Sequence, residues 1–171
     1  MLDRRYLALA LLLLGVGHAL AADDPLAVLE RVDADPLELA RVVDGLSSDA
    51  VLDALGKPAA VRRRLALVRA APWIDGAERA LLPLVQLMSG RDSLLAPAAA
   101  LAVARIVADL GDPARRAGEA VHDELKPARR AMLVVVDAQH VRQDIRGVAA
   151  EAIGACDDWL GPLPAVPEQP Q

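Results

Sequence analysis

Residues 144–154 read D-I-R-G-V-A-A-E-A-I-G, and this stretch decides how the rest of the chain is interpreted. Extended back to residue 141, it carries apolar side chains at intervals of four, three, four and four, at Val141, Ile145, Val148, Ala152 and Cys156. Side chains at these intervals share one face of an α-helix. The other face is polar, so we expect an amphipathic helix over 141–156 that buries the Val141 stripe against neighbours.

Weaker versions of the same pattern begin at residues 61 and 95. Residues 61–68 read V-R-R-R-L-A-L-V, and residues 95–104 read L-A-P-A-A-A-L-A-V-A. A repeated helix pair takes about 30–47 residues. The spacing from Val61 to Leu95 fits one such unit, and the spacing from Leu95 to Ile145 predicts one unit with an insertion around residues 112–126.

The segment at 145–154 resembles the second helix of a HEAT repeat, whose usual pattern is V-R-x-x-A-A-x-A-L-G. The segment at 95–104 keeps the alanine run, and the segment at 61–68 keeps the opening Val61-Arg62 pair. The run L-L-P-L at 81–84 resembles the kinked first helix of the family, with the kink at Pro83. The resemblance covers residues 36–156 and implies an all-α, right-handed α-solenoid of about three to four antiparallel helix pairs. An irregular helical bundle is the alternative.

Composition points to the same class. Of the 171 residues, 54% are apolar, and these are mainly Ala, Leu and Val. Ala and Leu are strong helix formers, and small Ala side chains let helices approach closely. The only cysteine is Cys156, so no internal disulfide is available and stability must come from packing.

The first 21 residues have the parts of a secretory signal peptide: a basic start, an apolar run and A-L-A before the expected cleavage site after Ala21. An uncleaved anchor is the alternative, but the apolar run is short of the ~20 residues that span a bilayer. We therefore expect a periplasmic or secreted protein with no membrane span after cleavage. The Arg-rich, Lys-poor composition is typical of a GC-rich bacterial genome.

The expected domain organisation follows from the signal and the tail. Residues 22–160 form the expected helical-repeat domain, and residues 161–171 form an expected disordered Pro-rich tail.

Proline, glycine and capping residues predict where the helices begin and end. Asp35 followed by Pro36 opens one helix, and Ser47 opens the next. Asp75 with Glu78 is expected to cap a helix that runs to residue 88. Pro127 is expected to open a helix that includes the β-branched cluster at 132–136, and a strand over this cluster is the alternative that its β propensity allows. Residues 93–110 are the most apolar part and predict a central buried helix.

Charge and aromatic content exclude nucleic acid as a partner. Cleavage after Ala21 removes one Asp and two Arg, which takes the formal net charge from −5 to −6. An acidic domain lacks the positive surface that phosphate contacts require. The chain has no Phe, and beyond the signal its only aromatic side chains are Trp73 and Trp159. Stacking platforms for bases need more aromatic surface than this.

Few residues suggest chemistry. His122 lies beside Asp123 and Glu124, but adjacent residues on a helix point different ways, and no second His follows at the spacing of a metal motif. His140 fits a helix start, and Cys156 fits a small buried residue on its stripe. We expect no catalytic site, cofactor or metal. A small metal-binding protein or enzyme that uses His122 and His140 is the alternative.

Arginine is the functional candidate, because it recurs on successive predicted helices. The candidates, as partner-binding or ladder residues, are Arg62, Arg63, Arg69, Arg129, Arg130, Arg142 and Arg146. In HEAT-like repeats the residues matching Arg62 and Arg146 pair with Asp of a neighbouring unit. The other hypothesis is an Arg-lined face that grips an acidic partner segment. We expect a non-catalytic scaffold for a protein or peptide partner, or a structural subunit of an envelope complex. The oligomeric state stays open.

Overall fold

The structure is a computed structural model, and it describes residues 24–31, 35–110 and 119–161. The expected signal peptide at 1–21 and residues 162–171 of the expected tail lie outside the described residues. Every regular element in the described ranges is a helix, three of them 3-10 helices (η): η1 (Pro25–Glu30), α2 (Pro36–Asp44), α3 (Ser48–Leu55), α4 (Val61–Ala70), η2 (Ala71–Trp73), η3 (Ala77–Ala80), α5 (Leu81–Met88), α6 (Leu95–Leu110), α7 (Glu119–Asp137) and α8 (Gln143–Leu160). The all-helical class that the sequence predicts is confirmed for this part of the chain.

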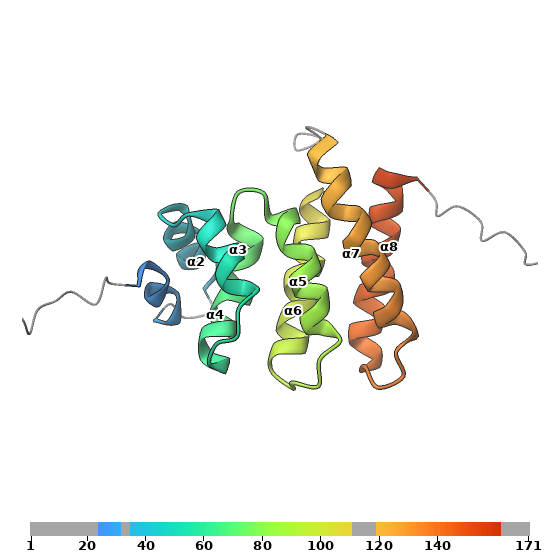
Figure 1. The fold of residues 1–171 in the computed structure, drawn as a ribbon, viewed down its shortest axis with the longest axis horizontal. Coiled ribbons are helices and arrows are strands. Elements are labelled where there is room, and N and C mark those ends of the chain that lie inside the picture. The colour runs from blue at the N-terminus through green and yellow to red at the C-terminus, as the bar shows by residue number, and fades with distance from the viewer. Residues whose placement is uncertain (1–23, 32–34, 111–118, 162–171) are drawn as a thin grey trace, which may run out of the picture.

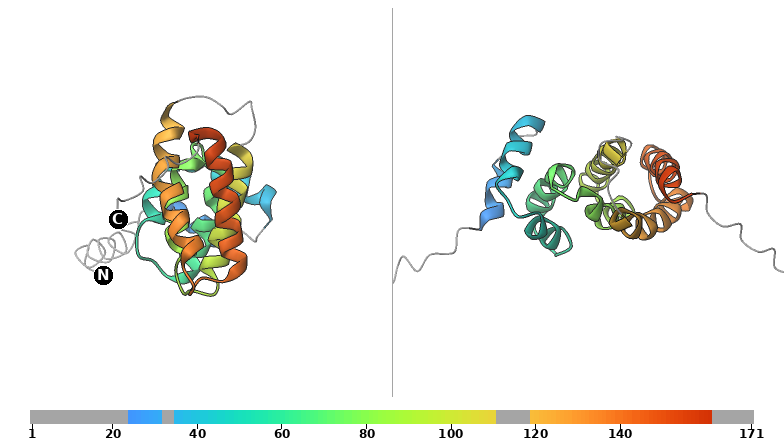
Figure 2. Two further views of the ribbon diagram at one scale, coloured as in Figure 1. Left: turned by 90° about the vertical axis from the view of Figure 1, so that its right-hand side faces the viewer. Right: turned by 90° about the horizontal axis from the view of Figure 1, so that it is seen from above.

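The helices form two rows of neighbours. In the first row α6 lies between α4 and α8, and in the second α5 packs against α7 while α3 contacts η3. The rows are joined within pairs, α3 with α4, α5 with α6 and α7 with α8. Figure 1 shows the pairs in succession along the long axis, and Figure 2 shows the same succession from above. The three aligned sequence segments, which begin at Val61, Leu95 and Ile145, lie at the starts of the three first-row helices.

Helix α6 occupies the centre of the first row and has the broadest buried surface. It contacts α4, α5 and α8. Its buried residues are small or branched: Leu95, Ala96, Ala99, Ala100, Ala102, Val103, Ile106, Val107 and Leu110. Alanine on a helix face removes the bulk that would hold neighbouring helices apart. The prediction of a central buried helix is therefore confirmed, although one stripe of α6 stays exposed, as described below.

Side chains cap α2 and α3 as the sequence predicts, and a further cap, which was not predicted, forms at Asp92. Asp35 caps α2 and Ser47 caps α3, each through a side-chain oxygen that accepts a backbone N–H. At the start of α6, Asp92 Oδ1 accepts from the backbone nitrogens of Leu95 and Leu94 at 2.9 and 2.8 Å. These two hydrogen bonds hold the pKa of the Asp92 carboxyl below its usual value.

The expected cap at Asp75 and Glu78 is wrong. Gly76 precedes the element instead, with a left-handed φ of 69° that favours glycine, and no side chain caps it. The chain then forms the 3-10 helix η3 before α5 begins at Leu81. Pro83 consequently lies in the first turn of α5, where backbone N–H groups have no partner in the helix, and it does not interrupt a helix interior.

The helix expected to open at Pro127 begins earlier. Helix α7 starts at Glu119 and carries Pro127 inside it, so part of the expected insertion at 112–126 is helical. A proline in a helix interior costs about 3 kcal/mol. The stripe that offsets this cost is buried on both sides of the proline, at Val121, Leu125, Ala128, Met132 and Val135. The β-branched cluster at 132–136 is helical, as predicted.

The Val141 stripe is buried nearly as predicted. Helix α8 begins at Gln143, so Val141 precedes it but is still only 5% exposed. Ile145, Ala152 and Cys156 are buried as expected, whereas Ala149 takes the fully buried position beside a half-exposed Val148. Among the described helices, none is both long and apolar enough to cross a membrane.

Close packing at α6 predicts a strong size limit at Ala99, which is 0% exposed. We expect Ala99→Leu to lower the free energy of unfolding by about 1–3 kcal/mol, because added methylenes in a filled core force neighbours apart. Urea denaturation followed by circular dichroism measures this. The matched control is Ala104→Leu on the exposed side of the same helix, which should change stability by less than about 0.5 kcal/mol. Equal effects at the two positions would contradict the packing described for α6.

Candidate partner-binding groove

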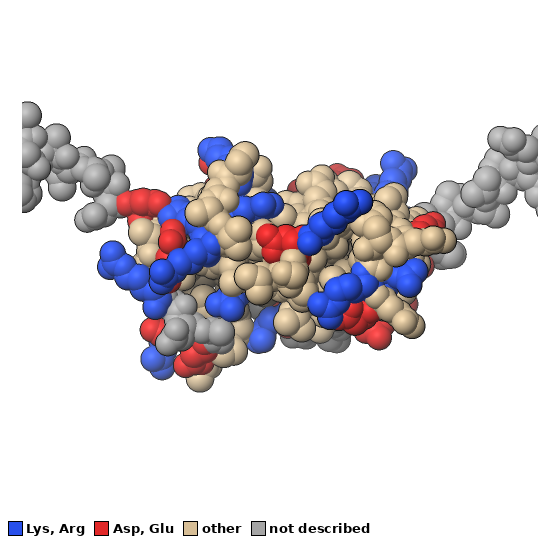
Figure 3. Space-filling view, turned by 90° about the horizontal axis from the view of Figure 1, so that it is seen from below, with Lys and Arg blue, Asp and Glu red and all other residues tan. Residues whose placement is uncertain are grey.

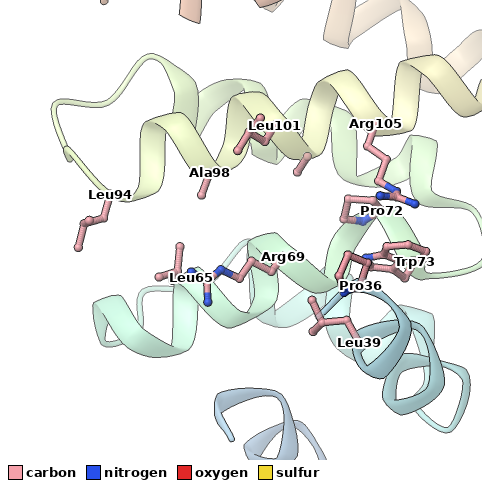
Figure 4. A pocket seen from close by; sticks show the side chains of 11 residues that line it. Pro36, Leu39, Leu65, Arg69, Pro72, Trp73, Leu94, Ala98, Leu101 and Arg105 are labelled. Carbon is pink, nitrogen blue, oxygen red and sulfur yellow. The ribbon is translucent and has the colours of Figure 1, made fainter. Parts of the chain in front are cut away.

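An open groove of about 530 Å³ separates α4 from α6 and ends against α2 and η2. Four elements and the residue before α6 line it. Helix α2 contributes Pro36 and Leu39, α4 contributes Leu65 and Arg69, and η2 contributes Pro72 and Trp73. The α6 side is made by Leu94, Ala98, Leu101, Ala102 and Arg105. Figure 4 shows Leu94 and Leu65 towards one end, Arg105, Pro72 and Trp73 at the other, and Arg69 between them. Eight of the eleven lining residues are aliphatic or proline, and none is Asp or Glu.

The α6 wall follows helical periodicity. Leu94, Ala98, Leu101 and Arg105 are spaced by four, three and four residues, so they form one stripe along the helix. Leu94 is 60% exposed and Leu101 is 72% exposed. The stripe therefore keeps two large apolar side chains in contact with water.

Two arginines supply the charge in the groove. The Arg105 guanidinium carbon lies 3.8 Å from the centre of the Trp73 ring, a cation–π contact that holds this side chain in place. Arg69 projects from α4 and is exposed. Within the described ranges, neither guanidinium has an ion pair with a carboxylate.

The seven candidate arginines do not gather on one face. Arg62, Arg63 and Arg69 lie on α4, Arg129 and Arg130 on α7, and Arg142 and Arg146 at or near the start of α8. Helix α7 belongs to the opposite row from α4 and α8. On the face that Figure 3 presents, Lys and Arg are spread out with Asp and Glu between them. Of the seven, only Arg69 lines the groove.

Arg129 has a structural role. It is 8% exposed, and its Nη1 donates to Asp157 Oδ1 at 2.6 Å and to the Gly161 carbonyl at 2.8 Å. These contacts join α7 to the last turn of α8 and satisfy carbonyl and carboxylate groups at that helix end. Burial and two internal partners leave Arg129 unable to reach another molecule.

Two arginines of α4, Arg62 and Arg63, make contacts within the fold. Arg62 donates to the Glu30 carbonyl at 3.1 Å, and Arg63 pairs with Asp24 at 2.5 Å and Glu30 at 3.3 Å. Both therefore fasten η1 to α4. The Arg63 guanidinium, as its hydrogen-bond donor, holds the pKa of the exposed Asp24 carboxyl below its usual value.

Of the remaining arginines, Arg142 forms an exposed ion pair with an aspartate, Arg130 is exposed and Arg146 is half-buried. Arg142 Nη2 lies 2.6 Å from Asp144 Oδ2, and this pair spans only two residues of the chain. Arg130 is exposed, and Arg146 is half-buried with no hydrogen-bond partner at Nε. In the part of the chain described, no ion pair of Arg62 or Arg146 with an Asp joins successive first-row helices, as a ladder would.

The two candidate histidines, His122 and His140, lie near opposite ends of α7, a helix of 19 residues and thus about 28 Å long. The His122 ring meets Trp159 edge to face at 6.3 Å, and His140 Nε2 lies 3.2 Å from the Ser89 carbonyl. The distance between them prevents a shared site. The described residues contain no group of three or more His, Cys, Asp or Glu side chains that could hold a metal ion.

Sequence reasoning missed the residues that make the groove, chiefly Trp73, Leu94, Leu101 and Arg105. One signal was available. The most apolar helix has more apolar side chains than one buried face needs, and those at 94, 98 and 101 form a second stripe that ends at Arg105. The other wall could not be found in the same way, because Pro36, Leu39 and Leu65 come from helices brought together only by the fold.

No known protein-family model, curated protein or solved structure matches this chain.

Cys156 lies at the α7–α8 interface rather than in the groove. It is 1% exposed, and burial raises the pKa of its thiol from about 9.0 to about 11, against a smaller opposing effect of Arg129. The thiolate is the nucleophilic form of cysteine, so burial and the raised pKa both make Cys156 unreactive.

We expect native Cys156 to react with a disulfide reagent such as DTNB only as the protein unfolds.

The raised pKa of the Cys156 thiol also predicts that the stability of the protein depends on pH. Below about pH 9 both states keep the proton, whereas between pH 9 and about 11 the unfolded chain releases it and the folded chain does not. The free energy of unfolding of the wild type should therefore fall more steeply between pH 9 and about 11 than that of the Cys156→Ala variant. Urea denaturation at each pH measures both. Fast labelling of Cys156 in the native protein would contradict its burial. Identical pH profiles of stability for the wild type and Cys156→Ala would contradict the raised pKa.

Proposed function

We propose that this chain is a HEAT-like α-solenoid that acts as a non-catalytic scaffold or adaptor for a protein partner. The solenoid assignment is supported by the order of contacts, since each helix pair packs mainly against the pairs before and after it. It is supported also by the three aligned segments, which begin within the first turn of the three helices of one row. An irregular helical bundle would bring distant pairs into contact around one core.

The groove between α4 and α6 carries the functional proposal. It leaves Leu94 and Leu101 exposed and offers the guanidinium groups of Arg69 and Arg105, which take part in none of the ion pairs between described residues. Extended helical-repeat surfaces of this kind suit protein or peptide partners. A structural subunit of an envelope complex would use the same surface with one permanent partner.

The scaffold proposal is tested by crosslinking the full chain in its native cells and identifying what is captured. We expect one or a few proteins to be captured reproducibly by the wild-type chain. A monomer with no reproducible neighbour, under conditions that crosslink known envelope complexes, would refute the scaffold proposal. A partner recovered in constant ratio under all growth conditions would instead favour the structural subunit.

Export is a separate part of the proposal and depends on residues 1–21. Expressed as the full chain in a bacterial host, the protein should be recovered from the periplasm or medium with Ala22 at its N-terminus. Cell fractionation with mass spectrometry of the intact protein measures both. The matched control is Leu12→Arg, which interrupts the apolar run and should keep the chain inside the cell. Recovery of the wild-type chain in the cytoplasm with residues 1–21 still attached would contradict export.

A further inference from the structure

We propose that the groove between α4 and α6 binds an amphipathic helix of a partner protein, with the partner's apolar side chains on Leu94 and Leu101 and its carboxylates on Arg69 and Arg105. This inference rests on the scaffold proposal and deepens it, because it names the surface that is used and the chemistry of the segment that fits it.

The apolar part of the argument starts from the stripe on α6. Leu94 and Leu101, 60% and 72% exposed, stand on either side of Ala98. Across the groove, Leu65 and Leu39 extend the same apolar surface onto α4 and α2 (Figure 4). Covering these side chains removes apolar surface from water, which is the main driving force for association.

The charge of the groove selects an acidic partner. Arg69 and Arg105 are the only charged residues in the lining. Contact with the Trp73 ring holds the Arg105 guanidinium while its N–H groups stay available, so little side-chain freedom is lost when a carboxylate binds. Both cations lie on one apolar surface, and neither takes part in an ion pair between described residues. Charge complementarity therefore favours Asp or Glu on the partner.

The shape of the groove favours a helix over an extended peptide. Peptides that bind as added strands need an exposed sheet edge, and the described part of the chain has no strand. Polyproline segments need a series of aromatic side chains, and here the single Trp73 is already covered by Arg105. Ala98 is half-buried between the exposed Leu94 and Leu101, and its small side chain lets another helix come close. From residue 94 to residue 105 the wall is about 16 Å long, which matches about three turns of a bound helix.

A small anionic amphiphile would satisfy the same chemistry less well. Sites for small ligands enclose about 70–90% of the ligand surface. Two leucines that are more than half exposed show that this groove is open along its length. An acyl chain lying here would keep much of its surface in water, whereas a helix would place only its apolar face in the groove.

The test uses a phage-displayed library of helical peptides of about 15 residues, selected on the purified full chain. We expect the enriched peptides to carry Leu, Ile or Met at helical spacing together with Asp or Glu. Fluorescence anisotropy should show at least tenfold weaker binding of these peptides to Leu101→Glu and to Arg105→Glu. Val134→Glu is the matched control. It alters a 68% exposed apolar residue on α7, in the other row, and should bind like the wild type.

A charge exchange makes the test specific. The double variant Arg69→Glu, Arg105→Glu should lose the acidic peptides and bind versions in which Lys replaces Asp and Glu. Unchanged thermal unfolding of each variant shows that the loss is not caused by misfolding, since all these positions are exposed.

Three outcomes would overturn the inference: no enrichment of acidic amphipathic sequences, binding that ignores Leu101→Glu and Arg105→Glu, or saturable binding of sodium laurate with no peptide binding. Self-association of the wild type that Leu101→Glu abolishes would assign the groove to a second copy instead. A partner crosslinked in cells and retained by the groove variants would refute this inference and leave the scaffold proposal standing.

Discussion

Helix α6 is packed against neighbours in three directions, and this constraint shapes the rest of the molecule. A helix between α4 and α8 that also rests on α5 must present small side chains, and Ala96, Ala99, Ala100 and Ala102 meet that demand. The chain has no Phe to fill larger spaces. Small side chains on α6 therefore pack beside larger buried ones such as Leu84 and Met88 on α5.

The groove follows from the same arrangement. Helix α4 gives way to η2 at Ala71, which places Pro72 and Trp73 where α4 and α6 diverge. The stripe of α6 from Leu94 to Arg105 is then left without a covering helix. Trp73 stabilises Arg105 there, while Arg62, Arg63 and Arg129 are held by internal carboxylates and carbonyls. Arginines of similar appearance in the sequence thus divide into those that hold the fold together and those that remain available.

Prediction from the sequence succeeded where a local interaction decides the outcome. Asp35 and Ser47 cap their helices with hydrogen bonds that span two or three residues, and Ile145, Ala152 and Cys156 are buried because their spacing gives one face. It failed at Pro127 and at Asp75, where a local rule competes with packing. The continuous buried stripe of α7 outweighs the cost of a proline inside the helix. Gly76, with its left-handed backbone, precedes η3 at the place where Asp75 was expected to cap a helix.

By itself, the sequence determined the helical class, the register of the buried stripes and the inert environment of Cys156, because periodicity and capping depend on residues within a few positions of one another. The tertiary structure alone decided which arginines are free and where the groove lies. Arg69 and Arg105 are separated by 36 positions in the chain, and Pro36 is farther still from Leu101. Their proximity depends on how helix pairs stack, and stacking is set by the sum of many small packing contacts that no single stretch of sequence contains.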